Sequence, residues 1–84
     1  MPNTKTWWRV LGIGHGRTRA IADVETLDAA KELVEDTARW YAAKEQTHPF
    51  TVTYDATDPK CVHATANLQG LIYSFVLAEV RVCQ

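Results

Sequence analysis

The chain has 84 residues, a net charge of −1 and two cysteines. This length accommodates one domain spanning residues 1–84, and the charge excludes a general electrostatic attraction to nucleic acid. The first residues lack the features of a signal peptide, and no apolar run is long enough to cross a membrane. Cys61 and Cys83 are too few for a disulfide framework, so we expect free thiols in a cytoplasmic protein, with a single bridge as the alternative.

Two strands around a glycine-rich turn are predicted at the start of the chain. The first covers residues 6–13, and Gly12, Gly14 and Gly16 interrupt the sequence at its end. The second covers residues 17–24, where alternation predicts two faces. One face would carry Thr18, Ala20, Ala22 and Val24, and the other Arg17, Arg19, Ile21 and Asp23.

An amphipathic helix is predicted over residues 26–46. Thr26 is a suitable N-cap because its hydroxyl can accept a hydrogen bond from a free backbone N–H. Glu35 and Arg39 have the spacing of an ion pair one turn apart, and Pro49 follows the predicted end of the helix. Apolar residues recur every three or four positions and predict one buried stripe, made of Leu27, Ala30, Leu33, Val34, Ala38, Tyr41 and Ala42.

The remaining sequence predicts further strands. Residues 50–54 alternate, residues 55–59 form a turn cluster, and residues 61–66 are a short strand followed by a turn at 67–70. The apolar run at 71–82 favours a long final strand, although it also fits a helical period. The predicted fold is therefore α+β: an antiparallel sheet of four to five strands in the order β-β-α-β-(β)-β, with the helix packed on one face.

No motif in the sequence indicates catalysis, a cofactor or a metal. The glycines at 12, 14 and 16 resemble a phosphate-binding loop, but a strand follows where such a loop needs a helix. They favour a hairpin turn, with an anion contact through His15, Arg17 and Arg19 as the alternative. Cys61 and His63, with Cys83 and His48 elsewhere, do not show the paired spacing of a structural zinc site, and no nucleophile signature occurs.

The tryptophan pair predicts a surface for a partner. Trp7 and Trp8 are neighbours on a strand and must point to opposite faces. One helix covers one face of the sheet, so the second tryptophan faces solvent, a partner or another part of the chain. The near-continuous apolar run at 71–77 is typical of a strand buried on both faces. Trp7, Trp8, Ile72 and Phe75 are therefore the candidate interface.

Part of the sequence resembles a known family. The segments Thr26-Leu27-Asp28-Ala29-Ala30-Lys31-Glu32-Leu33-Val34 and Phe50-Thr51-Val52-Thr53-Tyr54, with two strands before them, are similar to the small HicB-like antitoxin domains of actinobacteria. The resemblance covers about residues 6–55 and implies a ββ(β)αβ core and a partner toxin. Many members also carry a DNA-binding module, and no helix-turn-helix or ribbon-helix-helix pattern follows residue 60.

We expect a small non-enzymatic protein-binding or regulatory module, acting through a hydrophobic sheet face and as a homodimer. An accessory protein of bacteriophage or actinobacterial origin would suit such a domain. The alternative is nucleic-acid binding through the basic N-terminal hairpin, with Arg9, His15, Arg17 and Arg19 as contacts. A small-ligand enzyme is the least favoured alternative, because one helix on a sheet leaves little room for an enclosed pocket.

Overall fold

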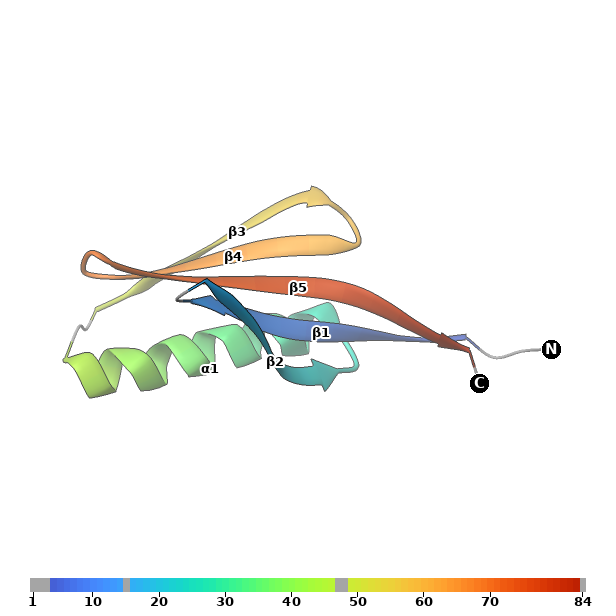
Figure 1. The fold of residues 1–84 in the computed structure, drawn as a ribbon, viewed down its shortest axis with the longest axis horizontal. Coiled ribbons are helices and arrows are strands. Elements are labelled where there is room, and N and C mark those ends of the chain that lie inside the picture. Colours follow the sequence, from blue (N-terminus) through green and yellow to red (C-terminus); the bar gives the residue numbers. More distant parts are fainter. Residues whose placement is uncertain (1–3, 15, 47–48, 84) are drawn as a thin grey trace.

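The structure, a computed structural model, describes residues 4–14, 16–46 and 49–83. Its elements are β1 (Thr4–Gly14), β2 (Arg17–Val24), α1 (Leu27–Glu45), β3 (Thr51–Asp58), β4 (Cys61–Leu68) and β5 (Leu71–Cys83). The five strands form an antiparallel sheet in the order β2-β1-β5-β4-β3 (Figure 1). The predicted α+β class and antiparallel sheet are confirmed. No helix in the described ranges is long and apolar enough to cross a membrane.

Strands β1 and β5 are the centre of the sheet. They pair along nearly their whole length, from Thr4 opposite Cys83 to Ile13 opposite Ser74. The pairing of β1 with β2 begins only at Trp8, and the pairing of β5 with β4 begins only at Ala78. The ends of β1 and β5 therefore continue past their neighbours as a two-stranded ribbon (Figure 1), which gives the molecule its long dimension of 51 Å.

Helix α1 begins and ends where the sequence predicts. The hydroxyl of Thr26 accepts a hydrogen bond of 3.0 Å from the Ala29 N–H, and Gln46 closes the other end in the left-handed region at a φ of 55°. The predicted pairing of Arg39 with Glu35 is wrong: the guanidinium lies 2.7 Å from Asp36 instead. Side chains three and four residues apart are both neighbours on a helix, and Arg39 contacts the nearer one.

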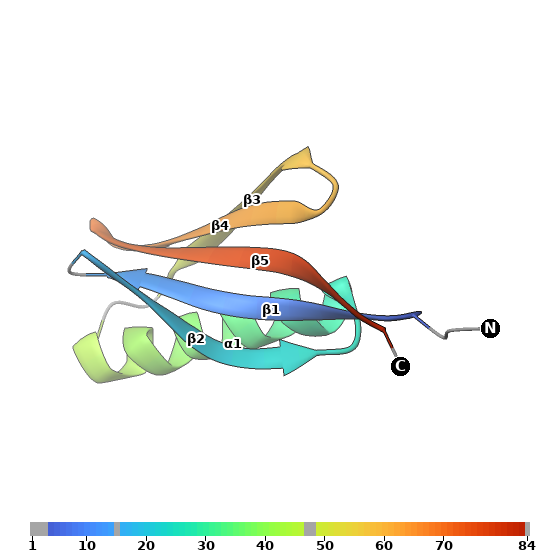
Figure 2. The same ribbon diagram turned by 45° about the vertical axis from the view of Figure 1, so that its right-hand side comes forward.

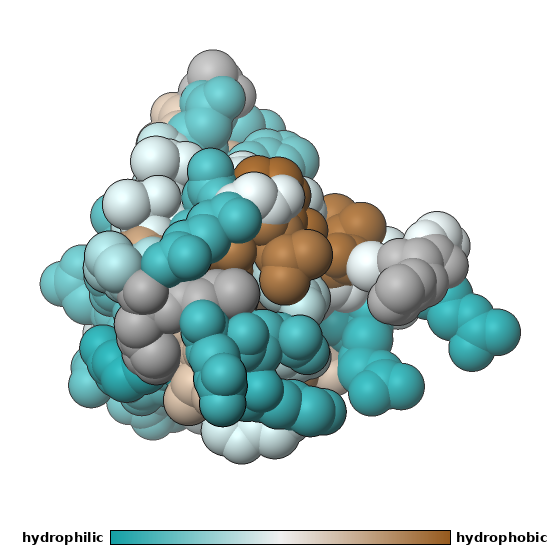
Figure 3. Space-filling model, turned by 90° about the vertical axis from the view of Figure 1, so that its left-hand side faces the viewer, coloured by the Kyte–Doolittle hydropathy of each residue, from teal (hydrophilic) through white to brown (hydrophobic). Residues whose placement is uncertain are grey.

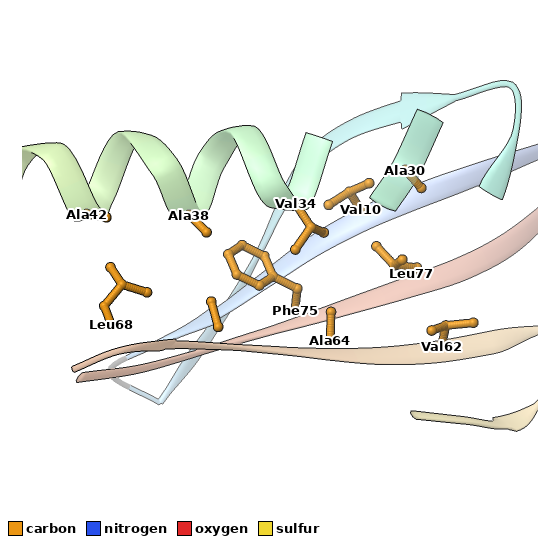
Figure 4. Packing of buried hydrophobic residues seen from close by; sticks show 11 residues of the cluster. Val10, Ala30, Val34, Ala38, Ala42, Val62, Ala64, Leu68, Phe75 and Leu77 are labelled. Atoms are coloured by element: carbon orange, nitrogen blue, oxygen red, sulfur yellow. The ribbon is translucent and has the colours of Figure 1, made fainter. Parts of the chain in front are cut away.

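The hydrophobic core lies between α1 and one face of the sheet. Figure 4 shows side chains of the helix and of the strands pointing toward one another, and Figure 2 shows α1 on one side of the sheet. The helix contributes mainly alanines, so its backbone lies close to the strands, which supply the larger side chains. The buried cluster consists of Val10, Ala30, Val34, Ala38, Ala42, Val62, Ala64, Ala66, Leu68, Phe75 and Leu77.

Two predicted turns are shorter than expected. β3 runs on to Asp58 with irregular pairing after Asp55, so most of the predicted turn at 55–59 is strand. Polar residues are tolerated there because β3 is an edge strand with a bulge. The turn between β4 and β5 reduces to Gln69 and Gly70, at φ values of 53° and 100°. After it, residues 71–83 form a strand, and the helical alternative is wrong.

A β-bulge in β2 overturns the predicted faces of that strand. Ala22 lies opposite Val10 and Ala20 lies opposite Leu11, which leaves Ile21 as an extra residue. One inserted residue reverses the alternation beyond it. Arg17 and Arg19, which lie opposite Gly14 and Gly12, therefore share the helix side of the sheet with Ala22 and Val24.

Candidate functional site

One candidate surface is the face of the sheet opposite α1. Side chains on this face alternate with the buried Val10 and Leu77. They form an apolar stripe along β1 and β5, made of Trp7, Leu11, Ile13, Ile72, Val76, Ala78 and Val80. Ile72 is 58% exposed and Ile13 is 39% exposed, and no described element lies over the stripe (Figure 1). We call this surface the uncovered face.

The two tryptophans divide between the faces as the strand pattern requires. Trp8 packs against the core on the helix side, whereas Trp7 lies on the uncovered face with the Lys5 ammonium 4.3 Å from its ring centroid. Ile72 is also on the uncovered face. Phe75 does not join them, because it is 3% exposed within the core. Of the predicted interface residues, the structure thus brings Trp7 and Ile72 to the open surface.

Arg9 lies on the uncovered face, where an acid engages its charge. Its guanidinium donates hydrogen bonds of 2.9 and 3.2 Å to the two carboxylate oxygens of Asp23. These bonds hold the pKa of Asp23 below its ordinary value. Together with Trp7 and Val80, the pair lines a shallow hollow of about 240 Å³. Arg9 is therefore separated from Arg17 and Arg19, with which the sequence grouped it as an anion contact.

Cys61 lies far from Cys83 along the sheet. Cys61 is a free thiol, and its sulfur lies 3.9 Å from Nε2 of His63. Cys61 pairs with Ala78 of β5, and Cys83 lies five residues further along that strand, a distance of about 17 Å. That separation excludes a disulfide between them. His48 lies outside the described residues, within which no group of metal-binding side chains is found.

A second candidate surface is a groove at one end of the molecule, between α1, the β1–β2 hairpin and the β4–β5 turn. We call it the end groove; its volume is about 1040 Å³. Figure 3 looks at this end and shows hydrophobic residues in the centre with hydrophilic ones on both sides. The lining residues are Gly12, Ile13, Gly14, Arg17, Thr18, Arg19, Ile21, Thr37, Tyr41, Leu71, Ile72, Tyr73, Ser74 and Phe75.

Glycine and tyrosine residues shape the end groove. On β1, a Cβ added at Gly14 would meet nothing within 4 Å, whereas a Cβ added at Gly12 would lie 3.3 Å from Cδ1 of Ile21. Tyr41 of the helix stacks on Tyr73 of β5 with ring centroids 4.7 Å apart and planes 11° from parallel. The β1 backbone is therefore open at Gly14 and covered by Ile21 at Gly12, and the stacked tyrosines form one side of the groove.

Among the described residues, Arg17 and Arg19 are the charged ones in the lining of the end groove. The other three arginines each form an ion pair: Arg9 with Asp23 at 2.9 Å, Arg39 with Asp36 at 2.7 Å and Arg81 with Glu79 at 2.7 Å. Arg17 and Arg19 are exposed and form no ion pair with any residue that the structure describes. His15, the remaining predicted anion contact, lies outside the described residues.

The sequence did not single out Ile21, Tyr41 and Tyr73 as site residues. Tyr41 belongs to the apolar stripe of the helix, and Tyr73 lies in an apolar strand, so both are typical of a core. The signal that was present is the pair of glycines at 12 and 14 within a strand, because glycine in a strand often marks close approach of another group.

Among the described residues, the uncovered face carries the Arg9–Asp23 ion pair and the contact between Cys61 and His63. The end groove carries Arg17 and Arg19 beside the hydroxyl groups of Thr18, Thr37 and Ser74. Both surfaces combine apolar area with charged or polar groups. Comparisons of the chain with models of protein families, with curated proteins and with solved structures found no match.

Proposed function

We propose that the chain is a small protein-binding module that acts through the uncovered face, with a second copy of itself as the partner. The observation that carries this proposal is the apolar stripe along β1 and β5. An antiparallel sheet with one solvated face alternates apolar and polar side chains, whereas strands that are apolar on both faces are typical of burial on both sides. The helix covers one side only.

The size of the uncovered face fits a dimer interface. Five strands about 4.8 Å apart and about eight residues long give roughly 600 Å² in projection. Side-chain relief increases this area, and each partner of a standard interface contributes roughly 800 Å² of accessible surface. One face of this sheet is thus sufficient for a specific dimer.

The arrangement of the face also fits a symmetric pair. The apolar stripe lies in the middle, and polar residues flank it on both sides. Thr53, His63 and Thr65 lie toward β3, and Asp23 lies on β2, where it pairs with Arg9 from within the stripe. An apolar centre with a polar rim is the usual anatomy of an interface. Two such stripes related by a twofold axis bury the same residues in both copies.

The resemblance to HicB-like antitoxin domains supports a protein-binding role, since those domains bind a partner toxin. The nucleic-acid alternative has less support, because Arg9 is paired with Asp23 and the net charge of the chain is −1. Phosphate contacts would show as an affinity for DNA or RNA that falls steeply with salt.

Sedimentation equilibrium over a range of micromolar concentrations tests the proposal. We expect a dimer that the substitution Val76→Asp converts to a monomer, because an unpaired carboxylate in an apolar interface is costly. Thr53→Asp, on the polar part of the same face, is the matched control and should leave the dimer intact. A wild-type chain that stays monomeric throughout the range refutes the proposal.

A further inference from the structure

We propose that the end groove is a second binding site, which takes an acidic peptide segment with apolar side chains from a partner protein. Its charged residues, Arg17 and Arg19, lie at the hairpin end of β2. Val76, the residue substituted in the dimer test, is absent from its lining, whereas Ile13 and Ile72 belong to both surfaces. The closing experiment therefore measures peptide binding and self-association separately.

Charge complementarity is the first argument. Arginines on a protein surface usually find a carboxylate nearby, as Arg9, Arg39 and Arg81 do here. Arg17 and Arg19 have none in the described chain, and no acid lines the groove. They project from the same side of β2 two residues apart, a spacing of about 7 Å. Two peptide carboxylates in an extended segment have the same spacing, so each can receive charge-assisted hydrogen bonds.

The apolar lining is the second argument. The described chain exposes five large hydrophobic residues, and four of them, Ile13, Ile21, Leu71 and Ile72, line this groove. Single exposed apolar residues are common, but a cluster around a depression is typical of a binding site. Alternating acidic and apolar side chains of one extended peptide would reach the arginines and the apolar floor in turn.

The open strand is the third argument. Because Gly14 lacks a side chain and a Cβ there would meet nothing within 4 Å, a ligand can approach the β1 backbone at this residue. At Gly12 the side chain of Ile21 already lies over the strand and adds to the apolar lining. Hydroxyl groups of Thr37, Tyr41 and Ser74 lie in the lining and can bond to the peptide backbone.

A peptide fits this groove better than a nucleic acid does. Single-stranded nucleic acids bind through several basic residues and through aromatic rings with a free face for each base. The groove has two arginines, Phe75 is buried in the core, and Tyr41 and Tyr73 stack on each other.

Selection from a displayed library of random short peptides tests the inference. We expect enriched peptides that combine acidic with apolar residues. Binding of a synthesised, fluorescently labelled winner should weaken about tenfold or more with the double substitution Arg17→Gln/Arg19→Gln, because both charge-assisted bonds are lost. Gly14→Leu, which fills the groove without changing charge, should weaken it as well.

The matched control is Arg39→Gln/Lys60→Gln, which removes the same charge at exposed positions outside the groove and should bind like the wild type. Circular dichroism checks that every variant is folded. The inference is overturned if no peptide is enriched, if the enriched peptides lack acids, or if they bind the Arg17→Gln/Arg19→Gln variant equally well. It is also overturned if the selected peptide fails to bind while an oligothymidine does, or if the groove variants instead abolish self-association.

Discussion

The two halves of the sheet use strand alternation differently. In β4 every second side chain is buried, from Val62 to Leu68, and the residues between them include His63, Thr65 and Asn67. In β5 the buried Phe75 and Leu77 alternate instead with uncovered-face residues that, apart from Ser74, are apolar: Ile72, Val76, Ala78 and Val80. The β3–β4 half is therefore suited to a sheet with one buried face and one solvated face. The β1–β5 half has the composition of strands that are buried on both faces.

The largest expected effect comes from neighbouring residues of β5 on opposite faces. Leu77→Ala should lower the free energy of unfolding by about 2–5 kcal/mol, because Leu77 is fully buried and its loss leaves a cavity. Val76→Ala is the matched substitution on the uncovered face and should cost much less at dilute concentration. Chemical denaturation measures both. If Val76→Ala is as costly as Leu77→Ala in a monomer, the uncovered face is not open.

The stability of helix α1 depends on the hydrogen bond that caps its first turn. Thr26→Ala should cost about 1 kcal/mol, because the hydrogen bond to the Ala29 N–H is lost. Thr37→Ala in the same helix is the control, since the Thr37 hydroxyl only bonds back to the Leu33 carbonyl and alanine favours helix. Thermal unfolding followed by circular dichroism compares the two, and an equal loss for both would contradict the capping role.

Tyr54 lies at the margin of the face that the helix covers, and its ionisation should lower the free energy of unfolding at alkaline pH. Burial, reinforced by the charge of Glu35, raises the pKa of Tyr54 to about 12. The unfolded chain ionises near pH 10, so the folded state alone keeps the proton above that value. Stability should be constant below about pH 10 and decline between about pH 10 and pH 12. In Tyr54→Phe this part of the decline should disappear, as denaturation at several pH values would show.

The smallest effect is expected on the uncovered face at Arg9. Arg9→Gln should leave the unfolding midpoint unchanged within error, because its ion pair with Asp23 is exposed to solvent. The same change should return the pKa of the Asp23 carboxyl upward to its ordinary value, which a carboxyl titration by nuclear magnetic resonance detects. A clear loss of stability would mean that this part of the face is buried in the working protein.

Local patterns predicted most elements of this fold. The spacing of apolar residues and the Thr26 cap located the helix, and branched residues located the strands. The feature that sequence reasoning missed is the bulge at Ile21. Nothing in residues 17–24 marks the extra residue, because its position depends on how β2 registers against β1. That register decides the side on which Arg17 and Arg19 lie, so the end groove required the structure.

The candidate interface could be predicted only in part, because the sequence shows that neighbouring residues separate but not which face each of them joins. Adjacent residues on a strand had to separate Trp7 from Trp8, and the structure shows that they do. The face that the helix covers depends on how the strands pair, which the sequence does not show. Phe75 was therefore grouped with Ile72, although the two lie on opposite sides of the sheet.

The central pairing of β1 with β5 also shapes how the chain folds. The first strand of the chain cannot complete its pairing until the last strand has been added, because Thr4 lies opposite Cys83. Until β5 is in place, the β1–β2 and β3–β4 hairpins have no strand between them, and the core beneath the helix is incomplete. Contacts between residues so distant in sequence are slow to form. We therefore expect slow, cooperative folding, in which the final strand joins two preformed hairpins into one sheet.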